Sequence, residues 1–233
     1  MVWRGQAWRY RAGGPADLTP LIDADLTRPE TVLPLLDFAG VAVFAATGAL
    51  AAAREKHDLV TFAFFGAITG VGGGTLRDLL IGAPVFWVQD WRYIAVCVAA
   101  ATAFWMLGAR TWRFRALLWL DAVGLAAYGV MGAAKAASYG VAPLICVVMG
   151  VLTACFGGVV RDVLAGQPSI LLRRELNITA ALLSAGLFVS LKALSVPTWP
   201  AVGVAVVAGF GLRAGALKWG WSLPAFPSAP TRN

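Results

Sequence analysis

The sequence has 233 residues, of which 59% are hydrophobic and 13% are charged, and its formal net charge is +7. So few charged side chains exclude an ordinary soluble domain, because such a domain needs more polar surface. Repeated apolar runs of about 20 residues indicate instead an all-α, polytopic membrane protein. In that setting the positive charge indicates basic cytoplasmic loops, and we expect no nucleic-acid partner.

The chain begins with a polar segment, residues 1–32, that is rich in tryptophan and arginine. It lacks the apolar core of a signal peptide, and we expect a mobile or interfacial tail. The first predicted transmembrane helix covers residues 33–53, and its length of about 31 Å matches one bilayer core. A charged loop at residues 54–58 separates it from the second.

The second predicted helix begins near residue 59 and contains three consecutive glycines, Gly72, Gly73 and Gly74. Because glycine is a weak helix former, this cluster predicts a break. The half before the break is about 21 Å long, which is too short to cross a bilayer alone. The second half, residues 75–81, leads into Gly82 and Pro84.

The remaining predicted helices cover residues 91–107, 116–137, 143–166, 176–194 and 197–218. The helix that begins at residue 143 carries a second predicted break, at Gly157 and Gly158. Seven transmembrane helices result, and we expect residues 219–233 to form an irregular tail.

Residues 33–115 and 116–195 are predicted to be two copies of one three-helix unit. An offset of 84 residues, with no gap, aligns Asp37 with Asp121, Gly73 with Gly157, Gly74 with Gly158, Arg77 with Arg161, Asp78 with Asp162 and Pro84 with Pro168. Because each copy has an odd number of helices, the second copy is inverted in the membrane. The seventh helix, within residues 196–218, has no counterpart.

A broken helix leaves backbone carbonyl and amide groups without partners. In a membrane such groups persist only where they are buried in protein or line water. Carbonyl groups can bind a cation, and two breaks at matching positions of inverted repeats indicate a permeation path or a substrate site. The alternative is that the glycines only allow helices to pack closely.

Each copy also places an arginine and an aspartate side by side in an apolar helix: Arg77 with Asp78, and Arg161 with Asp162. Neighbouring residues on a helix point in different directions, so we expect neither pair to be a self-contained salt bridge. Each charge then needs another partner or water. Charges inside a membrane indicate function, and a structural network between the repeats is the alternative.

Three further charges lie in predicted transmembrane helices. Lys135 stands where the first copy has Ala51. Its side chain either extends to the membrane surface or responds to voltage and controls opening of a path. Asp37 and Asp121 are predicted near helix N-termini, where carboxylates are favourable without any functional role.

The sequence predicts no catalytic, cofactor or metal site. The three cysteines, Cys97, Cys146 and Cys155, lie in apolar runs without metal-binding spacing, so we expect buried thiols. The single histidine, His57, lies in a loop, and no pairing of a nucleophile with a base is evident. We therefore expect no enzymatic activity.

Basic residues cluster in alternate loops, which predicts an inner-membrane protein with its N-terminus outside and its C-terminus in the cytoplasm. The predicted cytoplasmic set is Arg54, Lys56, Arg110, Arg113, Arg115, Arg173, Arg174, Arg213, Lys218 and Arg232.

Taken together, the seven helices, the repeat, the two glycine clusters and Lys135 resemble the trimeric intracellular cation channel family, in its prokaryotic branch. The resemblance covers residues 33–218. It implies a homotrimer in membrane lipid, with a pore in each protomer beside the second and fifth helices that passes monovalent cations, chiefly K⁺. It also implies that Lys135 matches a basic residue on the fourth helix of family members. Phe156 stands where the first copy has Gly72, and it is expected to narrow the path.

Two other interpretations remain open from the sequence. Inverted repeats with broken helices also suit an ion-coupled secondary transporter of a small zwitterion such as glycine. A structural membrane scaffold without any path is the third interpretation.

Overall fold

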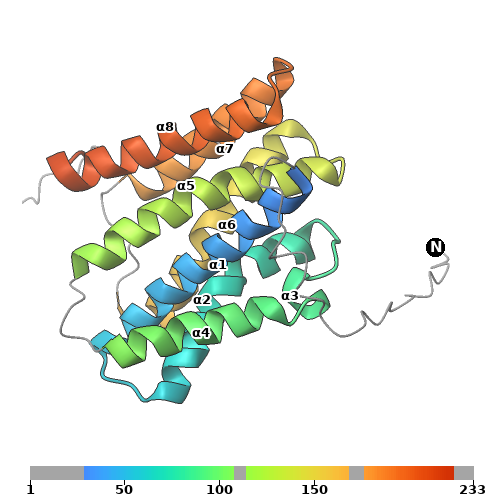
Figure 1. The fold of residues 1–233 in the computed structure, drawn as a ribbon. Coiled ribbons are helices and arrows are strands. Elements are labelled where there is room, and N and C mark those ends of the chain that lie inside the picture. The colour runs from blue at the N-terminus through green and yellow to red at the C-terminus, as the bar shows by residue number, and fades with distance from the viewer. Residues whose placement is uncertain (1–28, 108–113, 168–175, 223–233) are drawn as a thin grey trace, which may run out of the picture. The chain divides into compact units, whose positions relative to one another are not determined.

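The computed structural model describes residues 29–107, 114–167 and 176–222, and these form an all-helical structure (Figure 1). Its helices are α1 (Pro29–Arg54), α2 (Leu59–Leu80), α3 (Phe86–Gln89), α4 (Arg92–Leu107), α5 (Phe114–Ser138), α6 (Pro143–Leu164), α7 (Asn177–Ala193) and α8 (Thr198–Trp219). Residues 1–28 of the predicted polar tail and the basic residues Arg110, Arg113, Arg173, Arg174 and Arg232 lie outside the described residues, while residues 29–32 of that tail belong to α1.

Every predicted transmembrane helix has a counterpart in the structure, and the short α3 was not predicted. By length and composition, α1, α2, α5, α6 and α8 can cross a membrane. The apolar helices α4 and α7 have only 16 and 17 residues. A helix of that length is about 25 Å long, so the prediction of seven full transmembrane helices is not confirmed.

The helices α2 and α6 end in the same way. Gly82 and Gly166 follow them with φ values of 67° and 61°, a left-handed conformation that glycine adopts without strain. The amide of Ala83 donates to the Asp78 carbonyl at 2.8 Å, and that of Gln167 donates to the Asp162 carbonyl at 2.9 Å. The two sequence repeats therefore produce the same local structure at these helix ends.

The predicted breaks at Gly72–Gly74 and Gly157–Gly158 are wrong. Both α2 and α6 continue as α-helices through their glycines, over 22 residues each. The backbone groups there remain hydrogen-bonded within the helices, so they are not free to bind an ion. Tertiary packing accounts for the difference, because the glycines are used for close approach between helices.

This close approach is the crossing of α2 and α6. A Cβ atom at Gly73 would collide with the Thr153 carbonyl oxygen, and one at Gly157 would lie 2.6 Å from the Thr69 carbonyl oxygen. Thr69 and Thr153 are themselves equivalent in the two repeats, so the contact is symmetric. The pairing also runs in opposite directions along the two helices, as an inverted repeat requires.

The helices α1 and α5 form a second symmetric contact. The Tyr128 ring packs against Gly40, and the Phe44 ring lies 2.9 Å from where a Cβ at Gly124 would be. The two rings meet edge to face, with their centroids 5.2 Å apart. These residues are again pairs at an offset of 84, which agrees with the predicted inverted arrangement.

Within residues 37–222, α7 and α8 pack on α5 and on each other, while α4 packs on α2 (Figure 1). The three cysteines are buried free thiols, as predicted. Asp37 and Asp121 lie inside α1 and α5, more than one turn from each helix start, so the expectation that they lie at helix N-termini is wrong. The domain limits inferred from the sequence stay a prediction.

Candidate functional site

A narrow crevice lies where α1, α2, α5 and α6 meet. Its lining combines aromatic, glycine and threonine residues: Phe44, Thr69, Gly70, Gly73, Gly74, Tyr128, Thr153 and Gly157. The crevice has no room for a water molecule. Gly72 and Phe156 do not line it, although the Gly72 side of α2 approaches Gly157. The two glycine clusters predicted from the sequence therefore meet at one place.

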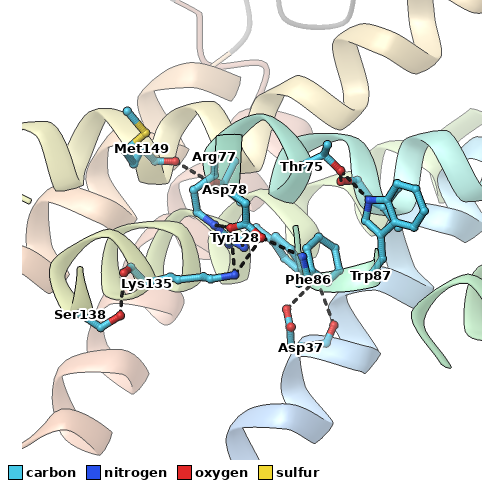
Figure 2. A network of polar contacts seen from close by, with 12 residues as sticks. Asp37, Thr75, Arg77, Asp78, Phe86, Trp87, Tyr128, Lys135, Ser138 and Met149 are labelled. Carbon is cyan, nitrogen blue, oxygen red and sulfur yellow. Dashed lines mark hydrogen bonds and ion pairs between the residues drawn. The ribbon is translucent and has the colours of Figure 1, made fainter. Parts of the chain in front are cut away.

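A cluster of charged residues lies about one helical turn from Gly74, around the Asp78 carboxylate (Figure 2). Arg77 approaches Asp78 Oδ1 at 2.8 Å through both Nε and Nη2. Lys135 Nζ, on α5, lies 2.9 Å from both carboxylate oxygens. The backbone amide of Phe86 donates to Asp78 Oδ2 at 3.1 Å. One carboxylate thus connects α2, α3 and α5.

Arg77 and Asp78 do pair, although their side chains were expected to point in different directions. An arginine side chain is long enough to fold back onto the next residue, and its Nε–H reaches the carboxylate. The expectation of a further partner is nevertheless met by Lys135 and the Phe86 amide. Asp78 is fully buried and Arg77 is 5% exposed, so these charges are held within the protein.

The Lys135 side chain is 29% exposed and points toward Asp78. Its ammonium group pairs with Asp78, and it lies 5.7 Å from the centroid of the Phe86 ring. This ring also packs against Gly74, where a Cβ would lie 2.6 Å from it. Lys135, Asp78 and Phe86 therefore lie together beside one end of the crevice.

A second charge cluster lies near Gly158 on α6. Arg161 Nε donates to Asp162 Oδ1 at 2.9 Å, and Nη1 donates to Asp121 Oδ1 at 3.0 Å. A Cβ at Gly158 would lie 3.6 Å from Arg161 Nη2 and 3.7 Å from Asp121 Oδ1. Arg161 is fully buried and holds α5 and α6 together.

The two clusters are related by the repeat but have different partners. Asp121 binds Arg161, whereas the equivalent Asp37 accepts hydrogen bonds from Tyr93 at 2.8 Å and from Tyr128 at 3.1 Å. Lys135 joins only the first cluster, because its counterpart is Ala51. The crevice therefore lies between two different clusters. In the first, two cations surround the Asp78 carboxylate, and in the second, two carboxylates surround the Arg161 guanidinium group.

The sequence alone did not indicate that several of these residues belong to the candidate site. Tyr93, Tyr128 and Phe86 read as ordinary aromatic residues of apolar segments, and only their neighbours in space reveal their contacts. Thr69 and Thr153 were visible as an aligned polar pair within the repeat. Each threonine lies four residues before a glycine of its cluster, Gly73 or Gly157, and this spacing could have indicated them.

The described residues contain no group of three histidine, cysteine, aspartate or glutamate side chains that could hold a metal ion. Outside the membrane-spanning helices, the Asp90 carboxylate accepts hydrogen bonds from Arg92 at 2.9 Å, and these lower the pKa of Asp90. At the start of α2, the backbone amide of Thr61 donates to Asp58 and lowers the pKa of that carboxyl group.

Comparison with known families finds one matching family model, described as a glycine transporter, at residues 34–109 and again at residues 118–193. The second match begins 118 − 34 = 84 residues after the first, which is the offset of the repeat. The internal duplication predicted from the sequence is therefore confirmed.

Two curated relatives are membrane proteins of similar length. A UPF0126 membrane protein of Vibrio cholerae is 36% identical over 211 residues, covering 88% of this chain and 87% of the relative. The UPF0126 inner membrane protein YadS of Escherichia coli is 36% identical over 195 residues, covering 82% of this chain and 94% of the relative.

Solved structures give the same fold. A trimeric intracellular cation channel orthologue from Rhodobacter sphaeroides is 47% identical, with a TM-score of 0.79, covering 82% of this chain and 100% of that one. A prokaryotic channel of this type, crystallised in 0.5 M KCl, is 27% identical, with a TM-score of 0.76, covering 83% of this chain and 100% of that one. These solved relatives are channels rather than enzymes. The duplicated family match, the curated membrane relatives and the shared fold together place this chain in the prokaryotic branch of the trimeric intracellular cation channel family.

Proposed function

We propose that this protein is a channel for monovalent cations, chiefly K⁺, with a path through each protomer of a homotrimer. The observation that carries the proposal is the crevice at the α2–α6 crossing, which has a charged cluster beside each end. Its position agrees with the path that the family resemblance implies, between the two glycine-bearing helices and their neighbours α1 and α5. The solved relatives, which are cation channels, support the same function.

The structure changes the mechanism that the sequence suggested. Because α2 and α6 are continuous at their glycines, backbone carbonyl groups there are occupied within the helices. Passage therefore requires α2 and α6 to move apart at the crossing, where the crevice has no room for water. Side-chain oxygens would then replace part of the hydration shell of the ion.

Lys135 is the candidate gating residue in this mechanism. Its ion pair with Asp78 connects α5 of the second repeat to α2 of the first. A positive charge that moves through the membrane field changes its energy by about 2.3 kcal/mol per 100 mV. Separation of Lys135 from Asp78 by voltage would release α2 from α5 beside the crevice.

The remaining site residues have a positioning role in the proposal. Arg77 and Asp78 hold one end of the crossing, and Arg161, Asp162 and Asp121 hold the other. With the N-terminus outside and the C-terminus in the cytoplasm of the inner membrane, the Lys135 cluster lies toward the outer side. Membrane lipids surround the apolar outer faces of the helices.

Single-channel recording tests this function. The purified protein is incorporated into a planar bilayer with a KCl gradient, and a parallel bilayer receives heat-denatured protein. We expect discrete current steps that reverse near the K⁺ equilibrium potential and persist, at smaller amplitude, when Na⁺ replaces K⁺. Reversal near the Cl⁻ potential would exclude a cation path.

An ion-coupled transporter of a small zwitterion is the second candidate, and the description of the matching family model favours it. Liposomes that contain the protein are tested for uptake of labelled glycine under a Na⁺ or proton gradient. Saturable, gradient-dependent uptake without single-channel currents would replace the channel by a transporter. The absence of both currents and uptake would favour a structural scaffold.

A further inference from the structure

The crevice at the α2–α6 crossing contains a hydroxyl group without a hydrogen-bond partner. Thr69 is 1% exposed, and its Oγ1 has no partner among the described residues. Thr69 also lines the crevice. Buried polar side chains nearly always form a hydrogen bond, because an unsatisfied one destabilises the fold, so this exception requires an explanation.

The repeat provides an internal comparison. Thr153 is the equivalent residue on α6 and is also 1% exposed, but its Oγ1 donates to the Met149 carbonyl at 2.6 Å. Thr75 Oγ1 donates in the same way to the Val71 carbonyl at 2.7 Å. Such a bond to the residue four positions earlier is common for threonine in helices. Thr69 does not form it, and its hydroxyl group remains available.

The surroundings place this hydroxyl group against α1, beside the α2–α6 crossing. A Cβ at Gly48 of α1 would lie 2.6 Å from Thr69 Oγ1, and one at Gly157 of α6 would lie 2.6 Å from the Thr69 carbonyl. Thr69 therefore contacts both neighbouring helices through positions that only glycine can occupy. No water molecule fits in the crevice to satisfy the hydroxyl.

We propose that Thr69 Oγ1 is a ligand for the permeating monovalent cation in the crevice, and that Thr153 Oγ1 is not. The inference rests on the proposed channel function. A hydroxyl oxygen is a neutral ligand that can replace one water molecule of a partly dehydrated cation. Thr69 Oγ1 is free to turn toward the cation, whereas the hydrogen bond to the Met149 carbonyl holds the Thr153 hydroxyl group against its own helix.

The matched substitutions Thr69→Val and Thr153→Val test this assignment, because each removes a hydroxyl group and keeps the branched shape. Single-channel currents of both variants and of the wild type are recorded in symmetric KCl, and K⁺/Na⁺ permeability ratios follow from ion substitution. We expect Thr69→Val to lower the K⁺ conductance by about fivefold and to change the permeability ratio, because a ligand for the ion is lost in the crevice. Thr153→Val should conduct like the wild type. Thr69→Ser, which keeps the hydroxyl group, should restore the conductance.

Thermal unfolding in detergent tests whether the variants are folded. Thr69→Val removes a buried group without a partner, so its melting temperature should equal or exceed that of the wild type. A conducting wild type with unchanged conductance in Thr69→Val, or with equal losses in both valine variants, would overturn the assignment of Thr69 and leave the channel function standing. A silent wild type would overturn the channel function itself, and the inference with it.

Discussion

The Asp78 carboxylate is the common acceptor of several polar contacts in the first repeat. It accepts from Arg77, from Lys135 and from the Phe86 amide, and it is fully buried (Figure 2). Arg77 is buried beside Asp78 and is costly to leave without this carboxylate, because its charge cannot be solvated there. The contribution of Asp78 to stability therefore exceeds that of a surface ion pair.

We expect Asp78→Asn to destabilise the folded protein by about 3 kcal/mol, since Arg77 and Lys135 would lose their anionic partner. Thermal unfolding of the purified protein in detergent measures the effect as a lower melting temperature. Asp90→Asn is the matched control, because the Asp90–Arg92 pair is partly exposed and contributes less than about 1 kcal/mol. Equal melting temperatures for the two variants would contradict the role given to Asp78.

Lys135→Met removes the charge that connects α5 to Asp78 and keeps much of the side-chain volume. Loss of about 1 kcal/mol of closed-state interaction should raise the open probability about fivefold and weaken its dependence on voltage. Currents recorded over a range of voltages give both quantities. Lys192→Met is the control, because Lys192 is exposed and its ammonium group donates hydrogen bonds to Val196 and Thr198 rather than to a carboxylate. If Lys135→Met opens as the wild type does, Lys135 is not the gate.

At the scale of helices, the close crossing of α2 and α6 forms the crevice of the candidate site. The low helix propensity of glycine predicted that these helices would be broken. In the structure the same glycines lie within continuous helices and remove the side chains that would keep the two helices apart. Helix propensity is a property of a single helix, whereas this contact depends on both α2 and α6. The sequence therefore indicated where the candidate site lies but did not predict its conformation.

The substitutions Gly73→Ala and Gly186→Ala compare a glycine at the α2–α6 crossing with a glycine that has space for a side chain. The added methyl group at Gly73 would collide with the Thr153 carbonyl, whereas at Gly186 it would meet no atom within 4 Å. We expect Gly73→Ala to lower the melting temperature and to change the currents. Gly186→Ala should be neutral or stabilising, because alanine is favoured over glycine in a helix by about 1 kcal/mol. A stable, normally conducting Gly73→Ala variant would show that the crossing is looser than described.

At the scale of the whole molecule, the two repeats produce one structure in two opposite orientations. The α2–α6 and α1–α5 contacts are symmetric, and the charged clusters are not. In the proposed channel, this asymmetry would give the two ends of the path different charges. The equal halves of the inverted repeat would separate at their crossing, and the asymmetric residues would decide the side from which opening is controlled.

The predicted orientation is tested by labelling single cysteines in intact cells. The native cysteines are buried free thiols, so the added ones should dominate the reaction. Lys56→Cys, in the loop after α1, should react with an impermeant maleimide only after the cells are broken. Tyr139→Cys, after α5, should react in cells whose outer membrane has been made permeable. The reverse pattern would place the N-terminus in the cytoplasm and the Lys135 cluster toward the inner side.

The proposed homotrimer is tested by native mass spectrometry of the protein released from detergent. We expect a main species of three chains, with lipid adducts at low collision energy. The sample should also be measured after dilution, because a specific assembly persists when chance association in micelles is lost. A species of one chain under all conditions would remove the trimer from the proposal and leave a path within a single chain possible.

The sequence by itself determined the membrane class, the helix positions, the duplication and the candidate site residues. These follow from apolar length, from an ungapped repeat and from charges that are costly in a membrane, all of which are properties of the chain alone. Only the tertiary structure decided that the glycine helices are continuous, that Lys135 pairs with Asp78 and that Thr69 is without a partner. Each of these depends on which atoms of a distant segment occupy the neighbouring space, and one-dimensional patterns do not contain that information.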